Sequence, residues 1–200
     1  MQRIVSIAVL ALCTACPKPA PVATPESTAP PPSPAPAAVV AAPSISADGV
    51  GGLTADSAVD EASLTAGFPG FEIKTSTRSS EGETMTVFEL HRDGALSLTV
   101  EPNSAGKVYR VTIVDPQSKS PAGIAVGATY AQMSEALPAH ECFRLVEERS
   151  DSLACYGKEL SSIGYVFGDA AKGQKLGVIP SKKALAPAAV TEILWLPESE

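Results

Sequence analysis

The residues between Pro17 and Pro43 constrain the fold more than any other part of the chain. Ten of the 18 prolines of this 200-residue sequence lie in this stretch, which holds only two charged residues. A segment of this composition buries too little apolar surface to form a packed core, and its prolines favour an extended, fairly stiff chain. We therefore expect a disordered Pro/Ala-rich linker over 16–44 and a single folded domain over 45–200.

The residues before the linker have the composition of a signal peptide. Arg3 is followed by an apolar run from Ile4 to Leu12, and then by small residues up to Cys16. The apolar run is much shorter than the ~20 residues that a membrane-spanning helix needs. We therefore interpret 1–15 as a lipoprotein signal peptide that is removed from the mature protein.

The end of this leader, Thr14-Ala15-Cys16, resembles the bacterial lipobox, in which a cysteine is acylated and becomes the first residue. We expect Cys16 to be diacylated and N-acylated (a palmitate-type anchor), since several acyl chains hold a protein on a bilayer where one does not. The expected location is the bacterial cell envelope, on the outer membrane and facing the periplasm. Cys13 stands where the lipobox most often has Leu. Two alternatives are cleavage before Cys13 and a soluble secreted protein in which Cys16 is an incidental thiol.

The charge of the expected domain excludes one class of partner. Residues 45–200 hold 13 Lys and Arg residues against 21 Asp and Glu residues, a net charge of −8. Binding to nucleic acid by release of counterions needs the opposite sign of charge. We expect no nucleic acid among the partners, which are instead the membrane, through the lipid anchor, and an envelope protein or cell-wall polymer.

Alternating apolar and polar residues predict antiparallel strands in two groups. Asp93-Gly94 is a strong hairpin signal between two of them. The expected strands are 71–78, 83–91, 95–101 and 107–114 in the first group, and 142–148, 153–157, 162–167 and 190–196 in the second. Trp195 lies in the apolar stretch Ile193-Leu194-Trp195-Leu196 and is expected in the core.

Two short helices complete the expected domain. Ser57-Ala58-Val59-Asp60 begins the first, and Gly67 and Pro69 end it. Thr129-Tyr130-Ala131-Gln132 has the pattern of a capping box and begins the second, which ends at Pro138. The fold class is therefore α+β: a curved antiparallel sheet of about eight strands with two short helices.

Cys142 and Cys155 are the two cysteines of the expected domain, and they flank a predicted hairpin. Because the leader directs the chain to an oxidising compartment, we expect a disulfide between them. The alternative is a metal site formed by both thiols with His140 and Glu141, although structural zinc sites usually have paired, closely spaced ligands. We expect no metal and no cofactor.

Enzymatic motifs are not evident in the sequence. Gly49-Val50-Gly51-Gly52 is shorter than a dinucleotide fingerprint, and neighbouring carboxylates such as Glu147 and Glu148 point to opposite faces of a strand. His91 is expected to be a solvated turn residue. We expect a non-catalytic domain with a role in binding or envelope assembly, and the alternative is a periplasmic enzyme with an unrecognised active site.

The connection over 169–189 is long, and loops of this length usually have a function. It carries four lysines in an otherwise acidic domain: Lys172, Lys175, Lys182 and Lys183. A solvated loop is one interpretation. The other is a contact surface for an anionic partner, either a wall polymer or lipid headgroups.

Several short motifs follow one another in a fixed order along residues 45–196. They are Gly49-Val50-Gly51 with Leu53-Thr54-Ala55, Gly123-Ile124 with Val126-Gly127, Cys142 with Cys155, Ile163, Tyr165 and Phe167, Val178-Ile179-Pro180-Ser181, and Ile193 with Trp195. Together these motifs resemble the RpoE-regulated (envelope-stress) lipoprotein family, an uncharacterised bacterial group. The resemblance implies an acylated envelope protein with a domain of unknown function, and it supplies no catalytic residues.

Overall fold

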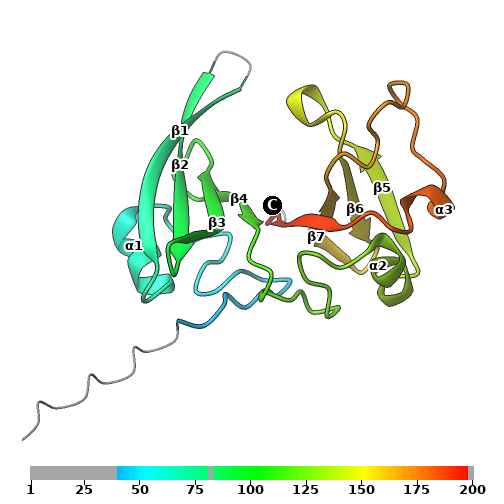
Figure 1. Ribbon diagram of the computed structural model, residues 1–200. Coiled ribbons are helices and arrows are strands. Elements are labelled where there is room, and N and C mark those ends of the chain that lie inside the picture. The colour runs from blue at the N-terminus through cyan, green and yellow to red at the C-terminus, as the bar shows by residue number, and fades with distance from the viewer. Residues whose placement is uncertain (1–39, 81–82, 198–200) are drawn as a thin grey trace, which may run out of the picture. The chain divides into compact units, whose positions relative to one another are not determined.

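Eight antiparallel strands form one open sheet in the computed structural model of the chain, which describes residues 40–80 and 83–197. The strand order is β1-β2-β3-β4-β8-β7-β6-β5, so that β1 and β5 form the two edges (Figure 1). The strands are β1 (Glu72–Ser80), β2 (Glu83–Arg92), β3 (Ala95–Pro102), β4 (Val108–Ile113), β5 (His140–Arg144), β6 (Leu153–Gly157), β7 (Leu160–Phe167) and β8 (Val190–Trp195). The predicted α+β class with an antiparallel sheet of eight strands is confirmed.

The strands join in two four-stranded groups. In the first group each strand pairs with the next one along the chain, and at the β2–β3 hairpin Asp93 and Gly94 both have positive φ, 53° and 80°. This is the backbone of the tight turn that the Asp-Gly pair predicts. The two groups meet at the β4–β8 pair, where the register joins only Val111 to Trp195, Thr112 to Leu194 and Ile113 to Ile193.

Both predicted helices are present. α1 (Glu61–Gly67) begins at Asp60, whose side chain accepts a hydrogen bond from the Ser63 N–H, so it starts three residues later than Ser57. α2 (Tyr130–Ala136) begins with the predicted capping box of Thr129 and Gln132. In each half of the domain, a seven-residue helix precedes strands that form a meander.

Two expectations about local structure are wrong in part. The strand predicted over 142–148 ends at Arg144, and residues 147–149 form the 3₁₀ helix η1 (Glu147–Arg149). The 169–189 connection contains a third helix, α3 (Lys182–Leu185), which the Ser181 hydroxyl caps by accepting from the Ala184 N–H. The single apolar position that α3 buries, Leu185, gives too weak a periodicity to predict a helix.

One face of the sheet packs against the helices and loops to form the core. The core includes Leu98, Ile113 and Tyr165 from the strands and Leu64 and Met133 from the helices. Trp195 is 1% exposed, as predicted, and its Nε1–H donates to the Ala47 carbonyl at 3.0 Å. The opposite face of the sheet carries the charged residues that form the candidate site.

Candidate functional site

The face of the sheet opposite the core contains a groove of about 980 Å³. One wall is formed by side chains of β1 to β4, including Arg78, Glu101, Tyr109 and Arg110. The other wall is formed by residues 145–149 together with side chains from β6 and β8. The groove therefore lies over the β4–β8 pair that joins the two halves of the sheet.

Glu101 is the centre of the first wall. Its side chain is 1% exposed, yet it accepts two charge-assisted hydrogen bonds of 2.6 Å, from Arg78 Nη1 to Oε1 and from Arg110 Nη2 to Oε2. Arg110 is the residue opposite Glu101 in the β3–β4 register, whereas Arg78 reaches it from β1. A buried carboxylate is stable only when it is paired in this way, so Glu101 fixes the positions of both guanidinium groups.

The second wall depends on the segment that follows β5. Leu145 packs on a small apolar cluster of Ala154, Val166 and Leu194, which lies on the groove face of the sheet. Glu147, in the turn after it, has φ of 53°, a conformation that few residues other than glycine adopt. Arg149 then donates to Glu192 of β8, with Nη2 2.6 Å from Oε2. These contacts hold residues 145–149 against the sheet, where they form the second wall of the groove.

Tyr156 lines the groove between the two walls. Its ring covers Gly164, its partner in the β6–β7 register, and a Cβ at that position would lie 2.5 Å from Tyr156 Cε1. Burial raises the pKa of Tyr156, and the charges of Arg110 and Arg149 act in the opposite direction. The phenol is therefore neutral at physiological pH and offers a hydrogen bond to a ligand.

The two walls carry charge of opposite sign. Arg78 and Arg110 share one carboxylate in the first wall, which leaves a net positive charge. In the second wall the single cation Arg149 stands with Glu147, Glu148 and Glu192. Both walls also carry exposed apolar side chains, Leu96 and Tyr109 in the first and Val146 in the second. Such a groove suits a ligand that has both charged and apolar groups.

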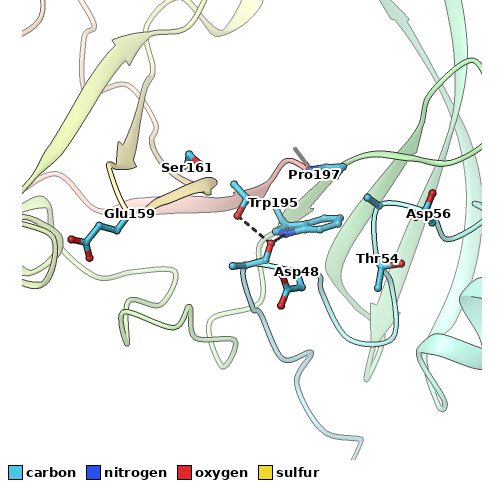
Figure 2. Close-up of a pocket in the computed structure, with 10 residues that line it drawn as sticks. Asp48, Thr54, Asp56, Glu159, Ser161, Trp195 and Pro197 are labelled. Carbon is cyan, nitrogen blue, oxygen red and sulfur yellow. Dashed lines mark hydrogen bonds between the residues drawn. The ribbon is translucent and has the colours of Figure 1, made fainter. Parts of the chain in front are cut away.

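A second, smaller hollow of about 390 Å³ lies at the end of β8 (Figure 2). Asp48, Asp56, Glu159 and Trp195 are among its lining residues. The Ala47 carbonyl accepts hydrogen bonds from Ser162 Oγ at 3.2 Å and from Trp195 Nε1. Asp56 is bound to Lys107, whose hydrogen bond and charge lower the pKa of the Asp56 carboxyl. We interpret this hollow as the place where the segment before α1 is hydrogen-bonded to the sheet.

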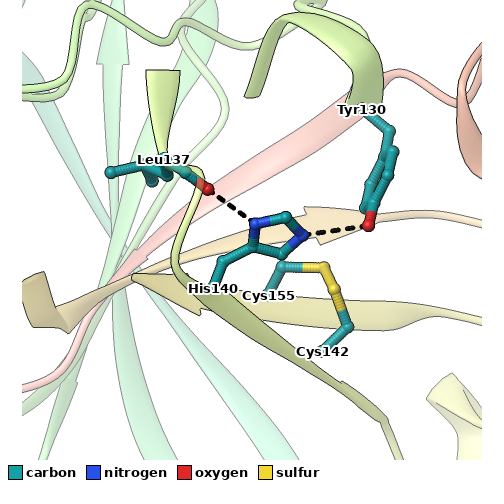
Figure 3. The surroundings of a disulfide bond; sticks show 5 residues. All are labelled: Tyr130, Leu137, His140, Cys142 and Cys155. Atoms are coloured by element: carbon teal, nitrogen blue, oxygen red, sulfur yellow. Dashed lines mark hydrogen bonds between the residues drawn. A yellow bond between two sulfur atoms is a disulfide. The ribbon is translucent and has the colours of Figure 1, made fainter. Parts of the chain in front are cut away.

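Cys142 and Cys155 form the disulfide that the sequence predicts (Figure 3). They are directly opposite each other on β5 and β6, with their Cα atoms 4.0 Å apart. The bond ties the edge strand β5 to the rest of the sheet. Because both sulfurs are in this bond, they offer no thiolate for the alternative metal site, and the described residues contain no cluster of three or more metal-ligating side chains.

Both histidines lie beside hydrogen-bonding partners within the domain. His140 lies beside the disulfide, where its Nδ1 is 2.6 Å from the Leu137 carbonyl and its Nε2 is 2.9 Å from the Tyr130 hydroxyl (Figure 3). A carbonyl only accepts, so Nδ1 carries a proton, and in the neutral ring Nε2 accepts from the Tyr130 hydroxyl. The prediction for His91 is wrong: it lies within β2, is largely buried, and has Nε2 3.4 Å from Glu89 Oε2. The turn is formed by the residues after it.

The structure places the four lysines of the 169–189 connection on the surface. Lys172 and Lys175 lie in the loop, and Lys182 and Lys183 form the first turn of α3. Cys16 lies outside the described residues. Within those residues, no helix has the length and apolar character to cross a membrane.

No sequence motif marks the groove as a whole. One part of the groove does have a sequence signal. The turn at Asn103–Gly106 places Glu101 opposite Arg110, and the alternation of apolar residues in these strands puts both on the polar face of the sheet. Arg78 comes from a strand with exposed residues on both faces, and residues 145–149 have no regular pattern. For these residues the sequence offers no signal.

The fold and the groove define a small, open antiparallel-sheet domain with its α-helices on one face. A family model described as "Protein of unknown function (DUF1131)" matches residues 36–197. The chain belongs to this family. No curated protein matches the chain.

Among solved structures, the chain is similar to the crystal structure of the uncharacterised protein YfeY from Escherichia coli. The two are 18% identical, with a TM-score of 0.62, and the match covers 76% of this chain and 99% of the other. At this level of identity the similarity shows a shared fold.

Proposed function

We propose that the protein is a lipid-anchored envelope lipoprotein whose domain binds a partner in the groove without catalysing a reaction. The observation that carries the binding role is the groove itself, whose walls are fixed by the Arg78–Glu101–Arg110 and Arg149–Glu192 ion pairs. Fixed donors and acceptors bind a ligand with little loss of side-chain entropy.

The chemistry of the groove favours a peptide segment of an envelope protein over a cell-wall polymer. The exposed aliphatic side chains Leu96 and Val146 provide contacts for the apolar side chains of a peptide, which the hydroxyl-covered edges of a polysaccharide do not match. Buried Glu101 holds Arg78 and Arg110 in place, and both guanidinium groups stay partly exposed, so they form a fixed recognition surface. A peptide carries the mixture of carboxylate, amine and apolar groups that the two walls require.

The groove is tested by crosslinking. A photoreactive amino acid at position 146 in cells that naturally make the protein should give one discrete crosslinked partner, and the same group at position 176 should not.

With that partner purified, L96S/Y109S/V146S should weaken binding at least tenfold, whereas the matched exposed change L176S should leave it unaltered. These residues are exposed, so each change should alter stability by about 0.5 kcal/mol or less. Equal affinities of the two variants would contradict the proposal, and a crosslink to glycan would assign the groove to wall polymer.

The anchor is proposed from the lipobox-like residues ending at Cys16. It is tested by detergent phase partitioning of the protein from its host, in which the unaltered chain should enter the detergent phase and the C16S chain the aqueous phase. Intact mass of the mature chain should show three acyl groups on residue 16. Recovery of both chains in the aqueous phase would contradict the anchor and leave the groove experiment unaffected.

A further inference from the structure

The exposed large hydrophobic side chains of the described residues fall in two places. Leu96, Tyr109 and Val146 line the groove, and Phe143 lies beside Tyr156. The remaining three are consecutive or nearly so in the β7–β8 connection: Leu176 is 84% exposed, Val178 43% and Ile179 45%. The groove does not account for this second group.

Leu176, Val178 and Ile179, which we call the apolar tip, lie on a loop whose backbone is held by hydrogen bonds. Arg144 of β5, itself largely buried, donates through Nη1 to the carbonyls of Gln174 at 3.1 Å and Lys175 at 2.7 Å. The Val178 N–H donates to the Lys175 carbonyl, and Gly173 and Gly177 have positive φ. The backbone on both sides of Leu176 is therefore held in turns, and the apolar side chains stay on the surface.

Lysines surround the tip on both sides. Lys172 and Lys175 precede it and Lys182 and Lys183 follow it, all four exposed, in a protein with a net charge of −7. Lys172 lies 3.7 Å from Asp169, the one acidic residue within the connection. Surfaces that insert shallowly into an anionic bilayer have this composition: apolar side chains at the tip and lysines around them.

We propose that residues 172–183 are a membrane-contact site for a bilayer that contains anionic lipid. The lysines match lipid phosphates, and the apolar tip enters the headgroup region. An anionic wall polymer has the charge to attract the lysines but no hydrocarbon to receive Leu176, so the apolar tip favours the bilayer. The contact is separate from the groove and does not depend on the anchor.

The experiment uses the full chain with Cys16→Ser in every sample, so that differences between variants report the loop. Flotation is measured with vesicles of phosphatidylethanolamine and phosphatidylglycerol, and with vesicles of phosphatidylcholine alone. Each lysine near an anionic surface contributes about fivefold to binding, so K175Q/K182Q/K183Q should lower partitioning onto the anionic vesicles more than tenfold. The matched triple K74Q/K119Q/K158Q, elsewhere on the surface, should lower it less than threefold.

The apolar tip is tested separately. L176S/V178S/I179S should lower partitioning at least tenfold while leaving the fall in binding with added salt unchanged, because salt screens only the charged part of the contact. F143S, a change of an exposed apolar side chain outside both the loop and the groove lining, is the control. In L176W, the new indole should shift its emission to the blue on anionic vesicles and be quenched by brominated lipid, against the constant signal of buried Trp195.

Equal partitioning of the two lysine triples would overturn the proposal, as would an L176W emission that does not change on vesicles. Partitioning that depends on the lysines but is the same for the serine triple and the unaltered loop would also overturn it, because the contact would then be electrostatic alone, with no insertion of the apolar tip. Circular dichroism of each variant should match that of the unaltered chain, because every substituted side chain is exposed.

Discussion

Two buried carboxylates organise the charged residues of the domain, and they do so for different purposes. Glu101 is held by two arginines whose own side chains are 48% and 26% exposed, so its ion pairs face the groove. Asp115 is paired with Arg92, and both are nearly inaccessible. The first arrangement shapes a surface, whereas the second stabilises the fold.

Asp115 provides a prediction about pH. Burial by itself would raise the pKa of Asp115, but hydrogen bonds from the Gln117 N–H, the Ser97 hydroxyl and Arg92, with the charge of Arg92, outweigh burial and lower it. A carboxyl whose pKa is lower in the folded state stabilises the fold above about pH 4, its unfolded value, and loses this effect as pH falls through the folded value. D115N should therefore lower the free energy of unfolding by about 3 kcal/mol at pH 7, because it leaves Arg92 buried without its charged partner.

The measurement is urea unfolding of D115N and of the unaltered chain from pH 7 to pH 3. The difference between their free energies of unfolding should narrow below pH 4. A difference that stays constant over this range would show that the charge of Asp115 contributes nothing and that only its shape matters.

At the level of elements, the disulfide stabilises β5, the shorter of the two edge strands of the sheet. β5 has five residues and pairs on one side only. Closing a loop of this size contributes about 3 kcal/mol by restricting the unfolded chain. The double variant C142A/C155A should lose about this free energy of unfolding in urea.

The same change tests what the bond does locally. Hydrogen exchange should become faster in β5 of the double variant than in β4, because β5 is an edge strand that pairs only with β6, whereas β4 pairs on both sides. An unaltered chain whose stability is the same with and without a reducing agent would contradict this role of the bond.

The elements could be predicted because their signals are local. Asp93-Gly94 specifies a turn, and Thr129 with Gln132 specifies a helix start, whatever the rest of the chain does. The groove depends on contacts between distant residues, such as Arg78 with Glu101 and Arg149 with Glu192, which are 23 and 43 positions apart. No local pattern encodes such pairings, and α3 has too few buried positions to show one.

The whole domain consists of two similar halves that share one core. α1 with β1 to β4 and α2 with β5 to β8 follow the same order, and the sheet runs outward from β4–β8 in each direction. The Leu64 and Met133 side chains are buried at equivalent positions, the fourth residue of each helix. The core cluster contains residues of both halves, including Leu98, Val111, Ile163 and Trp195.

A shared core predicts that the two halves unfold together. In urea, the fluorescence of Trp195, which reports the β4–β8 junction, should change at the same midpoint as the far-ultraviolet circular dichroism, which reports both halves. Two separate midpoints would show that the three residue pairs of the junction do not couple the halves.

The first described residue also has a mechanical consequence. The Val40 carbonyl accepts a hydrogen bond from Arg92 at the end of β2, and Met85, which lines the groove, is seven residues away on the same strand, about 23 Å at the rise of an extended chain. A pull on the chain at residue 40 would also pass along the backbone to Ala47, whose carbonyl accepts hydrogen bonds from Ser162 and Trp195. The sheet would therefore take up such a pull at β7 and β8 as well as at Arg92.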